Sequence, residues 1–301
     1  MKITLFGVRG SFPVPGKETF RYGGNTSSLC IEFNDKDFVI IDAGTGIRNL
    51  GNYLIKKENG LSDINILFTH THWDHIMGIP FFAPIYSGGA KIHMFGPSSN
   101  DEQSLKDIIL SQLEHKYFPV SAHELTAEVT QNQLSETSFE LLGAKISTIR
   151  LNHPCVTLGY RIEYKDNTLV TVFDHEPYHH TIFLDDGTAQ ILEGNSPLSS
   201  FKKLNDRLMN FIEGADIAIM DSQYTKSEYF NGKQGYGHSY YEYTLWLAKE
   251  AKIKKVILFH HDPVRTDAQL DVIAKSIENN IVENSYQFTA LLAKEGMEII
   301  V

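Results

Sequence analysis

The sequence predicts an α+β protein in which two β-sheets pack face to face, with helices on the outside. Two observations support this fold class. Short apolar runs of strand length are separated at close intervals by Gly, Asn and Asp turns. The two ends of the chain also mirror each other, since each combines a run of strands with strands and helices. With 301 residues, 42% of them hydrophobic, the chain can form one large domain with a full core.

Ten segments have the strand pattern of β-branched and aromatic residues bounded by turn residues. The first is the run KITLFGV at the N-terminus. The predicted strands are 2–8, 29–33, 38–41, 64–68, 91–95, 145–150, 158–164, 169–173, 217–220 and 256–259.

Five longer segments have apolar residues at helical spacing. The predicted helices are 47–57, 104–114, 200–211, 240–250 and 267–281. We expect a single domain over 1–301, with two segments that look like insertions, at about 98–135 and at about 175–200.

Composition narrows the class of partner. The formal net charge of −10 disfavours long polyanions, because affinity for a phosphate backbone needs a basic face. The net charge does not exclude a small anionic substrate, since bound cations can reverse the electrostatic field inside a pocket. No run of about 18 apolar residues is present, so no membrane partner is expected. The N-terminus lacks the pattern of a signal peptide, and we expect a cytoplasmic protein.

The two cysteines, Cys30 and Cys155, are too few for a disulfide framework. Cys155 lies two residues after His153, where a thiolate could serve as a metal ligand. A small buried apolar side chain is the favoured interpretation.

The run His70-Thr71-His72-Trp73-Asp74-His75 directly follows the predicted strand 64–68 and is the strongest functional signal in the chain. Imidazole nitrogens and carboxylate oxygens are ligands of zinc and similar divalent ions. His70 and His72 are two apart in an extended turn and can point toward one ion. Asp74 and His75 lie where the chain bends and can face a second ion.

Further ligand types recur at the ends of other predicted strands, where layered proteins commonly carry their chemistry. These residues are Asp42, His153, Asp174 and His260. Each alone is more often an ordinary polar residue at a strand end, but their joint occurrence with the central cluster indicates a metal site.

These residues, in this order, resemble the metallo-β-lactamase superfamily over nearly the whole chain. The resemblance implies a four-layer αβ/βα sandwich with two divalent metal ions, Zn²⁺ first, with Mn²⁺ or Fe²⁺ as alternatives. It assigns His70, His72 and His153 to one ion, Asp74, His75 and His260 to the other, and Asp174 to both. Asp42 would fix the orientation of a histidine ligand. His261 and Asp262 compete for the role of His260, which is preferred because it directly follows the strand.

Two stretches resemble the phosphodiesterase branch, which includes ribonuclease Z and bacterial cyclic-nucleotide phosphodiesterases. They are residues 7–27, containing GVRGSFPVPG and RYGGNTS, and the run Gly237-His238-Ser239. The resemblance places His238 beside the metals, in contact with the phosphate or leaving group; otherwise it is only a helix-start residue. Asn25, Thr26 and His175 are expected to contact substrate. The segment 175–180 either lines the pocket or is an exposed loop, and both interpretations stay open.

The resemblance therefore implies a metal-dependent phosphodiesterase in which a hydroxide bridging two ions attacks a small phosphodiester, with a 3′,5′-cyclic nucleotide as first candidate. Asp74 and His238 would be its catalytic residues. Only 21 positions separate His153 from Asp174, leaving no room there for the tRNA-gripping arm of ribonuclease Z, so tRNA is disfavoured as a partner. A homodimer is implied by the resemblance alone.

Three alternatives are kept. A ribonuclease Z-like RNA-processing nuclease would retain both stretches but needs a basic surface or an arm. A thioester hydrolase of the glyoxalase II kind uses the same ligands without needing either stretch. A non-enzymatic metal-binding or nucleotide-sensing protein would be expected to have lost a ligand, whereas none is missing here.

Overall fold

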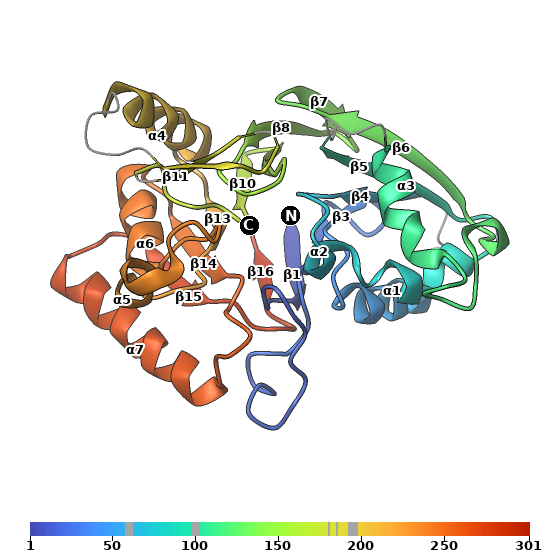
Figure 1. Ribbon diagram of the computed structural model, residues 1–301, viewed down its shortest axis with the longest axis horizontal. Helices are drawn as coiled ribbons and strands as arrows, with labels where there is room; N and C mark the ends of the chain where they lie inside the picture. Colours follow the sequence, from blue (N-terminus) through green and yellow to red (C-terminus); the bar gives the residue numbers. More distant parts are fainter. Residues whose placement is uncertain (58–62, 98–102, 180, 185, 192–197) are drawn as a thin grey trace. The chain divides into compact units, whose positions relative to one another are not determined.

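The computed structural model describes residues 1–57, 63–97, 103–179, 181–184, 186–191 and 198–301. The chain forms two compact units, unit 1 (Met1–Ser135 with Lys294–Ile300) and unit 2 (Glu136–Ala293 with Val301). Each unit is built on its own seven-stranded mixed sheet accompanied by helices (Figure 1). The predicted α+β class is therefore confirmed.

The sheet of unit 1 has the strand order β16-β1-β2-β3-β4-β5-β6. Its strands are β1 (Lys2–Gly7), β2 (Ser28–Glu32), β3 (Phe38–Ile41), β4 (Asp63–Leu67), β5 (Lys91–Pro97), β6 (Glu128–Leu134) and β16 (Glu298–Ile300). From β3 to β6 the neighbouring strands pair in parallel, and from β16 to β3 they pair antiparallel.

The helices of unit 1 pack on this sheet through apolar side chains. Residues Ile47, Leu50 and Leu54 are spaced on one face of α1 and belong to one buried cluster with sheet residues such as Ile40 and Ile66. The helical segments are α1 (Ile47–Lys56), α2 (Trp73–Ile76), α3 (Leu105–Leu110) and the 3₁₀ turns Ile79–Phe81, Ala83–Tyr86, Ser111–Leu113 and Ala122–Glu124.

The sheet of unit 2 has the strand order β15-β14-β13-β10-β9-β8-β7. Its strands are β7 (Ser138–Leu141), β8 (Ala144–Arg150), β9 (Leu158–Tyr164), β10 (Asn167–Val172), β13 (Ile217–Asp221), β14 (Lys255–Phe259) and β15 (Thr289–Leu292). From β10 to β15 the strands pair in parallel, and from β7 to β10 they pair antiparallel. A separate two-stranded ribbon joins β11 (Thr181–Phe183) to β12 (Ala189–Ile191).

The helices of unit 2 are α4 (Leu198–Ile212), α5 (Lys226–Glu228), α6 (Tyr241–Glu250) and α7 (Asp267–Glu283), with a π-helical turn at Tyr229–Lys233. Helix α6 contacts β13 and β14, and α7 contacts β15. Helix α7 begins with a capping box, in which the Thr266 side chain accepts the Gln269 N–H and Gln269 reaches back to the Thr266 N–H. Leu270, Ile273 and Ile277 form its buried face.

In both units the carboxyl ends of the parallel strands carry the predicted ligands, as expected for layered folds of this kind. Asp42 directly follows β3, and His70 comes three residues after β4. Asp174 follows β10, and His260 follows β14. The sheets thus place these side chains at two edges, one in each unit.

The single-domain prediction stays a prediction. Of the two predicted insertions, residues 98–102, 180, 185 and 192–197 lie outside the described residues. The remainder of the first segment contains α3 and the outer strand β6, and the second contains the β11–β12 ribbon. Among the described residues, no helix combines the length and apolar character needed to cross a membrane.

Candidate functional site

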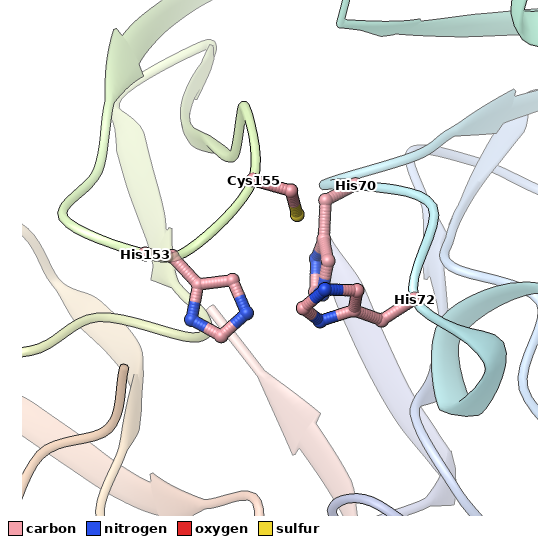
Figure 2. A group of neighbouring side chains, drawn as sticks. All are labelled: His70, His72, His153 and Cys155. Atoms are coloured by element: carbon pink, nitrogen blue, oxygen red, sulfur yellow. The ribbon is translucent and has the colours of Figure 1, made fainter. Parts of the chain in front are cut away.

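Unit 1 brings the four ligand side chains of the central motif together, with His70 and His72 on the turn after β4 and Asp74 and His75 in α2. The rings of His70 and His72 meet edge to face with centroids 4.7 Å apart (Figure 2). The centroids of His70 and His75 are 4.1 Å apart, and Asp74 Oδ2 lies 3.3 Å from His75 Nε2. The motif therefore forms one compact set of nitrogen and oxygen ligands.

Asp42 orients this set from the end of β3. Its Oδ2 accepts a hydrogen bond from His75 Nδ1 at 2.7 Å, and its Oδ1 accepts the Thr69 N–H at 2.8 Å. The Thr69 hydroxyl lies within 3.0 Å of both Asp42 oxygens and of His70 Nδ1. Since the hydroxyl donates to the carboxylate, it can accept from His70 Nδ1. Both rings therefore carry their proton on Nδ1, which leaves Nε2 as the nitrogen for an ion.

Asp74 is held by the loop that follows β1. The backbone N–H of Ser11 donates to Asp74 Oδ2 at 2.7 Å. Ser11 adopts a left-handed conformation with φ 62°, which a non-glycine residue rarely does. The stretch 7–16, singled out by resemblance, thus fixes one oxygen of a predicted catalytic carboxylate.

In unit 2, Asp174 turns its two oxygens toward different histidines. Oδ2 lies 3.6 Å from His153 Nε2, and Oδ1 lies 3.2 Å from His260 Nε2. Such spacings suit ligand atoms around metal ions, because ligands at about 2.0–2.2 Å from a tetrahedral ion lie a little over 3 Å apart. The arrangement fits a carboxylate that serves two ions.

The histidines of unit 2 also have their Nδ1 atoms engaged. His153 Nδ1 donates to the carbonyl of Gly237 at 2.8 Å. His260 Nδ1 lies 3.0 Å from Gln223 Oε1, which can only accept. Sequence reasoning missed Gln223, which lies 37 positions away and has no metal-ligand chemistry of its own.

His238 lies beside these ligands and is paired with Asp221. Its Nδ1 is 2.9 Å from Asp221 Oδ2, whereas the nearer Asp174 oxygen is 4.0 Å away. Its ring centroid is 4.9 Å from that of His260 and 5.3 Å from that of His153. Asp221 Oδ2 also accepts the backbone N–H groups of His175 and Ser239. Because Nδ1 is occupied, Nε2 is the atom through which His238 can act on a ligand.

Sequence reasoning also missed Asp221. It is the last residue of β13 and was assigned no role, although ligand types at the ends of other strands were noticed. That same signal could have found it. Groups of ligand-type side chains in unit 2 include His153 with Asp174 and His238, and Asp221 with His238 and His260; in each group the ligand atoms lie within 4.8 Å of one another.

His261 and Asp262, the alternatives to His260 as metal ligand, make hydrogen bonds to other groups. His261 Nε2 pairs with the carbonyl of Ala293 at 2.9 Å, and Asp262 Oδ1 accepts the Val264 N–H at 2.9 Å. Cys155 shares the loop of His153 (Figure 2), and its sulfur lies 3.7 Å from the Thr157 hydroxyl. It is half-buried, so the expected fully buried side chain is not found there; Cys30 is fully buried.

The three predicted substrate contacts are placed as follows. The Asn25 amide and N–H donate to Glu295, and Thr26 is buried with its hydroxyl accepting the Thr45 N–H. His175 is buried, and burial lowers its pKa to about 3, which keeps the ring neutral. Substrate contact by these residues stays a prediction.

The segment 175–180 is mostly inside unit 2 rather than being an exposed loop. Residues 175–178 are buried, His179 is exposed, and His180 lies outside the described residues. Glu176 is fully buried, and that burial raises the pKa of its carboxyl, while hydrogen bonds from Gly235, Gly237 and Tyr229 act in the opposite direction.

Three strand-end residues of the site share an unusual backbone conformation. Asp42, Asp174 and His260 have φ values of 58°, 38° and 64°. A non-glycine residue in this region costs on the order of 1–3 kcal/mol and persists where the surroundings hold it, which is common at functional sites. This conformation therefore coincides with three of the four strand-end positions that the ligand pattern selects, although it also occurs outside the site, for example at Lys165 and Ser285.

Comparison with known proteins places the chain in a family. Residues 38–261 match the family described as a beta-lactamase superfamily domain. Ribonuclease Z of Thermoplasma volcanium is 24% identical over 294 residues, which cover 89% of this chain and 89% of that protein. The chain therefore resembles that enzyme along nearly its whole length.

Solved structures share the fold. The metallo-β-lactamase fold protein YhfI from Bacillus subtilis matches with a TM-score of 0.65 and 17% identity, covering 99% of this chain and 98% of that chain. Human tRNase Z, short form, matches with a TM-score of 0.64 and 18% identity, covering 100% and 99%. At such identities the likeness shows the fold alone.

These comparisons correct one prediction. The expectation that tRNA is disfavoured as a partner is contradicted, because relatives along nearly the whole chain are named ribonuclease Z. The expectation relied on a missing arm between His153 and Asp174 and on net charge. Neither excludes RNA, since a basic surface elsewhere can bind phosphates and net charge does not describe the field near the site.

Proposed function

The chain belongs to the metallo-β-lactamase superfamily, and from that premise we propose that it is a metal-dependent phosphodiesterase of the ribonuclease Z-like branch. The observation that carries the proposal is the pairing of His238 with Asp221. This pair lies beside Asp174, whose two oxygens face His153 and His260. A histidine that is oriented by a carboxylate, and that is not one of the proposed metal ligands, is suited to proton transfer at a leaving group.

The proposed cofactor is a pair of divalent ions, zinc first, with manganese or iron as alternatives. Following the resemblance, His70, His72 and His153 would hold one ion, Asp74, His75 and His260 would hold the other, and Asp174 would contribute to both. The residues fit such ions because the Nδ1 atoms of His75, His153 and His260 each make a hydrogen bond. Nε2 of each ring is therefore the nitrogen that would bind an ion. When bound, such ions supply a hydroxide nucleophile near neutral pH and neutralise charge on phosphate oxygens.

The residues of the chain have distinct tasks in the proposed reaction. Asp74, fixed by the Ser11 N–H, orients the attacking water. Asp221 stabilises the protonated ring of His238 through Nδ1 and thereby leaves its Nε2–H to be given to the departing oxygen. Proton transfer of this kind contributes typically about 10²–10⁴-fold to a rate.

For the substrate we propose a small phosphodiester, with a 3′,5′-cyclic nucleotide as first candidate. RNA is the second candidate and is favoured by the relatives named ribonuclease Z. The cytoplasmic location and the homodimer stay predictions.

A turnover screen of the purified, metal-reconstituted protein tests the proposal. The substrates are bis-p-nitrophenyl phosphate, cyclic mononucleotides, precursor tRNA and a thioester, with Asp174→Asn as the matched inactive variant. Hydrolysis of phosphodiesters that is lost in Asp174→Asn supports the proposal. Turnover of a cyclic nucleotide supports the first candidate substrate. Processing of the 3′ end of precursor tRNA, with no turnover of cyclic nucleotides, supports RNA instead. Turnover of the thioester alone would refute the phosphodiesterase and favour the thioester hydrolase.

A further inference from the structure

Glu176 binds a segment far away in the sequence. Its side chain is fully buried, and its Oε1 accepts hydrogen bonds from the Tyr229 hydroxyl at 2.8 Å and the Gly235 N–H at 2.7 Å. Its Oε2 accepts the Gly237 N–H at 2.7 Å. All three donors belong to residues 229–237, which lie 53 to 61 positions further along the chain.

The segment 229–237 has little rigidity of its own. It contains a π-helical turn and three glycines at positive φ, Gly232, Gly235 and Gly237. Glycine has the largest backbone freedom, so such a turn needs outside contacts to adopt one conformation. A fully buried carboxylate that accepts two of its N–H groups provides such a contact, because the carboxylate and the buried Gly237 N–H would otherwise lack a hydrogen bond.

The end of this segment meets two of the functional histidines of unit 2, His153 and His238. The Gly237 carbonyl accepts from His153 Nδ1 at 2.8 Å, and His238 is the next residue. A side chain at Gly237 would lie 2.5 Å from His153 Nδ1, so the backbone and the imidazole are in direct contact. A shift of the turn would therefore move a metal ligand and the proposed proton donor together.

Glu176 is itself fixed next to His153. Its backbone N–H donates to the Asn152 carbonyl at 2.8 Å, and the Asn152 side-chain amide donates to the Glu176 carbonyl at 3.0 Å. Asn152 precedes His153 in the chain. The contacts therefore close a ring: Asn152 to Glu176, Glu176 to Gly237, Gly237 to His153, and His153 back to Asn152 through the peptide bond.

We propose that Glu176 is a positioning residue that sets the metal ligand His153 and the proton donor His238 jointly, by anchoring the turn that ends at Gly237. Its effect on His153 stands on the geometry of unit 2, and its effect on His238 rests on the proposed function. Glu176 reaches the reaction only through these two residues.

The first test needs no turnover. Hydrogen exchange of the metal-free wild type should show the Gly235 and Gly237 amides protected about 10²-fold or more over the unstructured rate, as expected for amides that donate to a fully buried carboxylate. In Glu176→Gln at least one of the two amides should lose most of that protection, because glutamine keeps one acceptor oxygen and its NH₂ group cannot accept. Zinc affinity, measured by competition with a chelator, should fall about 10–100-fold. The matched control is Glu228→Gln. Glu228 directly precedes the segment 229–237, and its carboxylate accepts the Thr225 N–H and pairs with Arg265. This variant should leave zinc affinity unchanged.

Rapid exchange of both amides in the wild type overturns the proposal, and so does wild-type zinc affinity in a folded Glu176→Gln. If that variant does not fold, Glu176→Asp takes its place, because it keeps the charge and shortens the side chain by one methylene. It should show the same loss of protection and of affinity. A folded Glu176→Asp with wild-type exchange and affinity overturns the proposal.

The second test is a double-mutant cycle on bis-p-nitrophenyl phosphate and on an alkyl phosphodiester with a poor leaving group. Glu176→Gln should slow the alkyl substrate more than the nitrophenyl one, because only the alkoxide needs a proton. In the His238→Ala background that difference should vanish. Additive effects on both substrates overturn the link to His238. Absence of any turnover by the wild type refutes the proposed function instead, and the metal and exchange measurements still decide the role of Glu176.

Discussion

Replacing Gly237 by Ala tests whether the contact between the turn and His153 controls metal binding. Gly237 has φ +85°, and an added Cβ would lie 2.5 Å from His153 Nδ1 and 2.6 Å from Pro154 Cδ. The left-handed conformation costs an alanine about 1–2 kcal/mol. Relief of the clash requires the imidazole or the turn to move, which breaks the Nδ1 hydrogen bond that orients His153. Loss of such an orienting bond typically lowers metal affinity by about 10–100-fold.

Gly235→Ala is the matched control, because Gly235 has φ +82° on the same turn and no atom lies within 4 Å of its added Cβ. Gly235→Ala should lose about 1–2 kcal/mol of unfolding free energy in the metal-free state, and Gly237→Ala should lose at least as much. Only Gly237→Ala should lose zinc affinity as well. The assays are urea denaturation of the apo-proteins and zinc titration against a chelator. Equal zinc affinity in the two variants would refute the reasoning, because the clash would then be absorbed without moving His153.

Three further predictions concern metal content, the orienting carboxylate and acid stability. Elemental analysis after reconstitution should give two metal equivalents per chain, and Asp174→Ala should give about one with nearly all activity lost; one equivalent in the wild type contradicts the pair of ions. Asp221→Asn should leave metal content unchanged and slow turnover of a poor leaving group by about 10²-fold or more, whereas unchanged turnover would show that Asp221 is only structural. Burial acts to raise the pKa of Glu32. The hydrogen bond to Lys57 and the positive charges of Lys57 and Lys2 outweigh that effect, so the pKa of Glu32 lies below the ordinary value of 4.5. The stabilisation is present above pH 4.5 and is lost as the pH falls through the lower folded value. Glu32→Gln should therefore flatten the fall of urea midpoints between pH 5 and pH 3, and an unchanged slope in this variant would refute the assignment.

The sequence predicted some strands with the observed bounds because their residue patterns are clear: Phe38–Ile41 is a continuous apolar run, and Leu158–Tyr164 alternates apolar residues with glycine or charged ones. Phe38–Ile41 and Leu158–Tyr164 were predicted with the observed bounds, and both consist mainly of β-branched, aromatic and aliphatic residues. The strands that were not predicted lie near sheet edges or in the small ribbon. Glu128–Leu134 has only Leu134 fully buried, and Glu298–Ile300 spans three residues, so neither shows a clear pattern without its partner strand.

The candidate ligands could be predicted because metal chemistry restricts residue type. His70, His72, Asp74 and His75 are recognisable from four neighbouring positions. The residues that orient ligands could not be found in this way, because a carbonyl, an amide or a carboxylate serves equally well as acceptor. Gln223 and the carbonyl of Gly237 reach their histidines across 37 and 84 positions, and only the fold brings them there.

The acceptors around the histidines explain how the site can be built before a metal ion is bound. A neutral imidazole carries one proton, and a ring that donates through Nδ1 presents an unprotonated Nε2. Asp42 imposes this state on His75, Gly237 on His153 and Gln223 on His260, each through contacts inside one unit. The positive φ values of Asp42, Asp174 and His260 are costly for these residues and persist because the surrounding contacts hold the backbone. Metal binding to such a site then costs little reorganisation of the rings, and a substitution that disturbs an acceptor should weaken metal affinity even though it removes no ligand.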